Sequence, residues 1–139
     1  MGEKYKFHYP LKVRYAETDA QGHVFFGNYY TYFDEGLVEY LRELGFSYQD
    51  VLKEGTDLLY VETGCRHYAS ARFDDILHVH TTLAKIGNSS LTFKFSIYKQ
   101  PEDELVATGH IVAVNVDQAT RRPAPVPEAL REAVARYEG

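Results

Sequence analysis

The chain has 139 residues, 45% hydrophobic and 14% aromatic, which is enough apolar material for the core of one domain spanning residues 1–139. Its 20 acidic and 15 basic residues give a net charge of −5, and no run of lysines or arginines is present to neutralise a phosphate backbone, so we expect no nucleic-acid partner. One cysteine, no signal-peptide pattern and no apolar run of about 18 residues predict a cytoplasmic protein without an integral membrane segment.

The first segment has the two-residue period of a half-buried strand. Apolar residues occupy every second position from Tyr5 to Tyr15, with mostly basic residues between them. Pro10 has no N–H to donate to a neighbouring strand. We therefore expect either a strand at the edge of a sheet or a bulge at this position.

The next segment has a helical period. Apolar residues from Tyr29 to Leu44 recur at a spacing of three and four, which predicts one amphipathic helix of about four turns. Asn28 is expected to cap its N-terminus and Gly45 to end it in the left-handed conformation. A second short helix is expected at 47–54.

Strand-like segments follow Gly55. Residues 87–89, Gly-Asn-Ser, predict a hairpin, and residues 105–116 are so continuously apolar or small that we expect a central strand covered on both faces. A proline cluster then precedes a short C-terminal amphipathic helix. The predicted strands are 57–74, 77–83, 91–98 and 105–116. This order predicts an α+β fold in which an antiparallel sheet of about five strands wraps around one long helix.

The junction between the first strand and the helix carries the residues that could take part in a reaction. Thr18-Asp19 is followed after two residues by Gly22, and Asn28-Tyr29 stands at the predicted helix start. This spacing, in its strand-to-helix context, resembles the signature of the 4-hydroxybenzoyl-coenzyme A thioesterase-like hotdog family. The similarity covers essentially the whole chain and includes Asp74-Asp75, Ala107-Thr108-Gly109, Arg122-Pro123 and Val126-Pro127.

The resemblance implies a hotdog fold that assembles as a homodimer or as a tetramer built from two dimers, with acyl-coenzyme A clefts at the subunit interface. It implies an acyl-CoA thioesterase that hydrolyses a short-chain, medium-chain or aromatic acyl-CoA to the free acid and CoA. We expect neither a cofactor nor a metal.

The implied catalytic group is Asp19, acting as nucleophile or as general base for water. The resemblance also implies a substrate-binding set. Backbone N–H groups around Phe26, Gly27 and Asn28 are expected to polarise the thioester carbonyl at the positive end of the helix. Gly22 would let the chain turn close to the substrate. Tyr29 completes the substrate-binding set.

The segment also departs from the family pattern. In several members of the family a His occupies the position of Phe26 and is proposed to assist catalysis, whereas Phe cannot transfer a proton. His23 is the nearby imidazole here, and we expect it to orient or activate the site. Tyr15 corresponds to another proposed helper, although its position in the strand pattern favours core packing equally.

Structural interpretations stand beside these roles. Asp19 and Asn28 are also common turn and cap residues. His78 and His80 share one strand face, but without a third ligand a solvated face is favoured over a metal site. Cys65 is expected to be buried and inert, while His67 and His110 are expected to be structural. Five basic residues either contact CoA phosphates or serve solubility: Arg66, Arg72, Lys85, Arg121 and Arg122.

Two other functions fit the same residues. The first is a hotdog-fold acyl-thioester dehydratase or hydratase, for which His23 is the one candidate acid-base residue. The second is a non-catalytic acyl-CoA-binding sensor, against which the presence of Asp19 argues.

Overall fold

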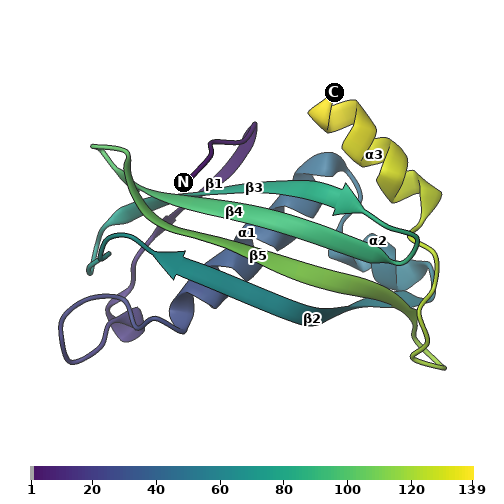
Figure 1. Cartoon of the computed structure of the whole chain (residues 1–139), viewed down its shortest axis with the longest axis horizontal. Helices are drawn as coiled ribbons and strands as arrows, with labels where there is room; N and C mark the ends of the chain where they lie inside the picture. Colours follow the sequence, from purple (N-terminus) through teal and green to yellow (C-terminus); the bar gives the residue numbers. More distant parts are fainter. Residues whose placement is uncertain (1) are drawn as a thin grey trace.

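The structure, a computed structural model, describes residues 2–139 and contains five strands, three α-helices and one 3₁₀ turn within them (Figure 1). The strands are β1 (Phe7–Lys12), β2 (Thr56–His67), β3 (Ile76–Ile86), β4 (Ser90–Gln100) and β5 (Glu104–Asp117). The helices are α1 (Asn28–Leu44), α2 (Tyr48–Lys53) and α3 (Glu128–Glu138), and the 3₁₀ turn is η1 (Tyr15–Glu17).

The five strands form one antiparallel sheet in the order β1-β3-β4-β5-β2. Figure 1 shows α1 behind the strands, so that the sheet covers one side of the long helix. This is the predicted hotdog architecture. The predicted edge position of the strand containing Pro10, the second short helix and the C-terminal helix are also confirmed.

The core lies between α1 and the inner face of the sheet. The ring of Phe33 on α1 stacks on Phe95 of β4 with 4.7 Å between centroids. Phe33 also lies directly over Gly109 of β5, where a Cβ atom would overlap the ring and come within 2.7 Å of the carbonyl oxygen of Gly64. The helix can approach the sheet closely because position 109 carries no side chain.

Three sequence expectations about strands were wrong. The first strand ends at Lys12 rather than Tyr15, because the chain turns into η1, and Tyr15 is 76% exposed instead of packed in the core. The middle strand is β4; β5, expected there, is internal but lies one position nearer the edge. His80 is not solvated: it is 6% exposed, and its Nδ1 lies 3.0 Å from the N–H of Tyr5 in the N-terminal segment.

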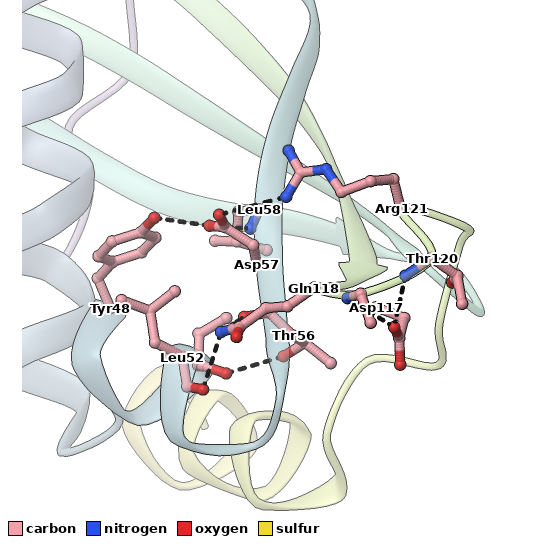
Figure 2. Close-up of polar contacts among 11 residues, drawn as sticks. Tyr48, Leu52, Thr56, Asp57, Leu58, Asp117, Gln118, Thr120 and Arg121 are labelled. Atoms are coloured by element: carbon pink, nitrogen blue, oxygen red, sulfur yellow. Dashed lines mark hydrogen bonds and ion pairs between the residues drawn. The ribbon is translucent and has the colours of Figure 1, made fainter.

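A polar network joins the end of β5 to the α2–β2 connection, at the end of the sheet farthest from residues 18–27 (Figures 1 and 2). Asp57 accepts hydrogen bonds from the Tyr48 hydroxyl at 2.6 Å and the Leu58 N–H at 2.8 Å. Gln118 donates to the carbonyl oxygens of Leu52 and Thr56 at 3.0 and 2.8 Å. These contacts join a carbonyl in the last turn of α2 to the carbonyl of the first residue of β2, and they help to fix where β2 begins.

No helix within residues 2–139 combines the length and the apolar composition needed to cross a lipid bilayer.

Replacing Gly109 by Ala is expected to destabilise the fold by about 1 to 3 kcal/mol, because the added methyl group must displace the buried ring of Phe33. Gly64→Ala is the matched control. Its methyl group would meet only the exposed ring of His110, which can move away. Urea unfolding of both variants measures the difference, and equal stabilities would contradict close packing at Gly109.

Candidate active site

The carboxylate of Glu17 holds the segment that carries Asp19. One oxygen accepts hydrogen bonds from the Arg14 N–H and from the Tyr32 hydroxyl on α1, both at 2.9 Å, and the other accepts from the Arg14 guanidinium at 2.9 and 3.1 Å. Burial raises the pKa of Glu17, but these donors outweigh burial and hold the pKa below its usual value. Burial and the neighbouring Glu17 raise the pKa of Tyr32, so its hydroxyl remains a donor at neutral pH.

The backbone carbonyl of Glu17 closes the loop 18–27 from the other end. It accepts the N–H of Phe25 and the side-chain amide of Asn28, each at 2.9 Å. The predicted capping role of Asn28 is therefore wrong: Gly27 is the N-cap, and the Asn28 side chain reaches back to Glu17 instead. Glu17 is therefore hydrogen-bonded to residues on both sides of the loop.

Asp19 lies in a tight turn inside this loop. Its N–H donates to the carbonyl of His23, and its own carbonyl accepts the N–H of Gly22, each at 2.9 Å. Gly22 has φ 84°, a left-handed conformation that favours glycine. One carboxylate oxygen of Asp19 accepts the N–H of Gln21 at 2.9 Å, so the expected turn role is observed. The other oxygen lies 3.9 Å from Nδ1 of His23.

A cleft of about 260 Å³ opens beside this turn. Asp19 and His23 line it, and their side chains are 26% and 30% exposed. Of the predicted substrate-binding residues, Phe26 and Tyr29 also line the cleft, whereas Gly22, Gly27 and Asn28 do not. The structure thus brings together an acid, an imidazole and two aromatic rings from a segment of eleven residues.

The start of α1 offers two backbone donors rather than the three predicted. Among the described residues, the N–H groups of Phe26 and Gly27 have no acceptor. The N–H of Asn28 donates to the carbonyl of Phe25 at 2.9 Å, so the expectation that it is free was wrong. The first turn of α1 is tightened in this way, and the donors nearest the cleft are those before the helix.

His67, which the sequence predicts as structural, also lines the cleft. It is the last residue of β2, and its ring meets the edge of Tyr29 with 5.0 Å between centroids. No local pattern indicates this, because it depends on how β2 passes the start of α1.

The neighbouring thiol of Cys65 lies 4.0 Å from Nδ1 of His67. Burial raises the pKa of Cys65 to about 11, so the thiol is not a ready nucleophile at neutral pH. The described residues contain no group of three or more His, Cys, Asp or Glu side chains arranged to hold a metal ion.

Comparison with known proteins assigns the family. The family described as "Thioesterase-like superfamily" matches residues 13–134. The chain belongs to this superfamily. The predicted enzyme class, a thioester hydrolase, is confirmed by relatives named as acyl-CoA thioester hydrolase and acyl-CoA thioesterase.

Individual members of the thioesterase-like superfamily resemble the chain along most of its length. The acyl-CoA thioester hydrolase YbgC of Escherichia coli O6:H1 is 29% identical over 124 residues, 89% of this chain and 92% of that protein. The DHNA-CoA thioesterase of Staphylococcus aureus superposes with a TM-score of 0.87 at 26% identity, over 94% of this chain and 89% of the other. The gentisyl-coenzyme A thioesterase BH1999 superposes with a TM-score of 0.81 at 29% identity, over 93% and 99%.

Replacing Glu17 by Gln is expected to lower the free energy of unfolding at neutral pH by about 1 to 3 kcal/mol, because it removes a charged acceptor from three donors. Since the pKa of Glu17 in the folded state lies below its usual value of 4.5, this contribution is complete above that pH. It is lost as the pH falls through the lower, folded-state pKa.

Glu39→Gln is the control, because Glu39 makes only an exposed ion pair with Arg42 and should contribute less than about 1 kcal/mol. Chemical unfolding from pH 3 to pH 8 provides the measurement. A Glu17→Gln effect that stays constant down to pH 3 would rule out the charge of Glu17 as its source.

Proposed function

We propose that residues 1–139 form one domain that hydrolyses the thioester bond of an acyl-CoA to a free acid and CoA, with Asp19 at the centre of the reaction. The observation that carries the proposal is the carboxylate of Asp19, held in a cleft beside the start of the long helix α1. The similar proteins support the substrate class, because each is named for action on a CoA thioester.

The carboxylate of Asp19 can begin the reaction in two ways. The carboxylate oxygen near His23 accepts no hydrogen bond from the backbone and can attack the thioester carbon. The tetrahedral adduct then expels the thiolate and leaves an anhydride, which water cleaves. Alternatively, the same oxygen can take a proton from a water molecule that attacks the carbon directly. Both routes need the carbonyl carbon near this oxygen and yield the same products.

The N–H groups of Phe26 and Gly27 would stabilise the negative charge that develops on the carbonyl oxygen. They lie at the start of a 17-residue helix, where the helix dipole favours negative charge. The side chain of Phe26 itself cannot donate a proton. A proton for the departing sulfur would come from an imidazole, and His23 and His67 are the two that line the cleft.

The acyl group would lie against the rings of Phe26 and Tyr29. Aromatic, short-chain and medium-chain acyl groups all suit such a wall, and the edge of an aromatic acyl ring would meet the face of another ring favourably. The two similar structures named for DHNA-CoA and gentisyl-coenzyme A favour an aromatic acyl group.

The edge strand β2 would pair with a second copy of the chain. β2 has twelve residues and pairs within the sheet only with β5, which leaves its other edge without a partner among residues 2–139. Val61 is 61% exposed and Tyr60 is 44% exposed on this strand. A long edge strand with exposed apolar residues is a site for strand pairing. We propose a homodimer through β2, and two such dimers can associate into a tetramer.

Asp19→Asn is expected to lower kcat for acyl-CoA hydrolysis by at least about a hundredfold, because an amide can neither attack as a carboxylate nor take a proton from water. Binding of the substrate should persist. Release of free thiol measures hydrolysis, and calorimetry measures binding. Unchanged hydrolysis would contradict the role of Asp19, and binding of CoA thioesters without any turnover in the unaltered protein would favour a sensor. Water addition to an enoyl-CoA without hydrolysis of a saturated thioester would favour a hydratase.

Val61→Lys is expected to convert the dimer to monomers at micromolar concentration, because pairing through β2 would bring two lysines together at the interface. Ala119→Lys adds the same charge at an exposed position after β5 and should leave the dimer intact. Sedimentation equilibrium distinguishes the species. A Val61→Lys variant that remains dimeric would exclude β2 as the interface.

A further inference from the structure

A second pocket, the outer pocket, lies on the face of the sheet turned away from α1. It has a volume of about 510 Å³, nearly twice that of the cleft beside Asp19. Hydroxyl groups of Thr92 on β4 and Thr108 on β5 contribute to its lining, whereas Ser96 is buried there and its Oγ accepts the N–H of Glu3 at 3.1 Å. Arg66 on β2 and Lys94 on β4 also line the pocket. Hydroxyl donors with two cations are the groups that bind phosphate.

The two cations are available to a ligand. Within residues 2–139, neither Arg66 nor Lys94 forms an ion pair or a side-chain hydrogen bond. His110, which also lines the pocket, is occupied by Glu62, with 2.7 Å between its Nε2 and the carboxylate. Glu3 is the one acid among the lining residues. The outer pocket is therefore locally positive on a chain whose net charge is −5.

The outer pocket and the cleft lie on opposite sides of the sheet, and both reach the end of β2. Arg66 and His67 are consecutive residues of this strand, so their side chains point to opposite faces of the sheet, Arg66 into the outer pocket and His67 into the cleft. Ala69 and Ser70, in the loop after β2, also line the cleft. A ligand that occupies both sites would have to pass around the end of β2, a route that leaves the edge of the strand free for a second copy.

We infer that the outer pocket binds the phosphate groups of the substrate's CoA nucleotide while the thioester lies beside Asp19. This inference rests on the proposed function. CoA joins its sulfur to the nucleotide through the long, flexible pantetheine arm, and the nucleotide carries a diphosphate and a 3′-phosphate. The guanidinium of Arg66 can bind phosphate oxygens through two parallel hydrogen bonds, and Lys94 adds a point charge. Of the five basic residues that the sequence offers as phosphate contacts, only Arg66 lines this pocket.

The test compares two substrates with the same acyl group, an acyl-CoA and the acyl-pantetheine that lacks the nucleotide. Arg66→Gln and Lys94→Gln are each expected to raise KM for the acyl-CoA about tenfold, as the loss of a charge-assisted hydrogen bond implies, with kcat changed less than about twofold. Neither should alter the kinetics of the acyl-pantetheine. Arg136→Gln and Lys53→Gln, which remove the same charges from exposed positions outside both pockets, should affect neither substrate.

Glu3→Gln provides a change of opposite sign. Because it removes the one acid among the lining residues, it should lower KM for the acyl-CoA and leave the acyl-pantetheine unaffected. The KM advantage of the acyl-CoA over the acyl-pantetheine should also fall as salt rises, since an exposed phosphate contact is screened. If Arg66→Gln and Lys94→Gln change both substrates equally, or change neither, the inference is wrong.

Binding of adenosine 3′,5′-bisphosphate, the nucleotide without its arm, separates failure of this inference from failure of the proposed function. Calorimetry should detect binding that Arg66→Gln and Lys94→Gln weaken and Asp19→Asn does not. That result stands even if neither thioester is hydrolysed, an outcome that would overturn the proposed function alone. Inorganic phosphate that competes as strongly as the bisphosphate would identify a general anion site and overturn the assignment to the nucleotide.

Discussion

The hydrogen bonds at Glu17 are the interaction on which the rest of the site depends. Its carboxylate joins Arg14, which precedes the loop, to Tyr32 on α1, and its carbonyl receives Phe25 and Asn28 from the far end of the loop. A buried carboxylate without such partners would be costly, so the same donors that stabilise Glu17 also close the loop. The turn that holds Asp19 is thereby connected to α1, whose buried face packs in the core of the fold.

This arrangement divides the chemistry between side chains and backbone. Asp19 is the one acid that lines the cleft, so it contributes the negative charge, while the start of α1 contributes N–H groups and a positive dipole. In the proposed reaction, proton transfer to sulfur would fall to the two imidazoles that line the cleft, His23 in the loop and His67 at the end of β2. Because His67 belongs to an edge strand, pairing of that strand with a second copy would bring the partner close to the cleft.

The periodicity of the sequence predicts most of the fold, and local pattern predicts the part of the site that is local. The long helix, its end at Gly45, the hairpin at 87–89 and the antiparallel strands depend on burial that repeats every two or 3.6 residues. Asp19, Phe26 and Tyr29 lie within eleven residues of the sequence, so their spacing alone predicts that they line the same cleft.

The remaining features depend on contacts between distant segments. His67 reaches the cleft only through the course of β2 past α1, and His80 is covered only because the N-terminal segment crosses the outer face of the sheet. Asn28 and Tyr15 were misjudged for a different reason. Asn28 can either cap a helix or hydrogen-bond to a more distant residue, and here its side chain bonds to the carbonyl of Glu17. Tyr15 can belong either to a strand or to a turn, and here it lies in the 3₁₀ turn. Sequence spacing carries no signal of that choice.

The central claim is that the thioester carbon binds against the carboxylate of Asp19 with its oxygen toward the start of α1. The most direct measurement is a crystal structure of the protein with a non-hydrolysable acyl-CoA analogue. The account predicts a carboxylate oxygen of Asp19 either within about 3 to 3.5 Å of the atom that replaces the thioester carbon or hydrogen-bonded to a water at that distance from it, with the analogue's oxygen facing the N–H groups of Phe26 and Gly27. An acyl group bound elsewhere, with Asp19 facing only solvent, would contradict it.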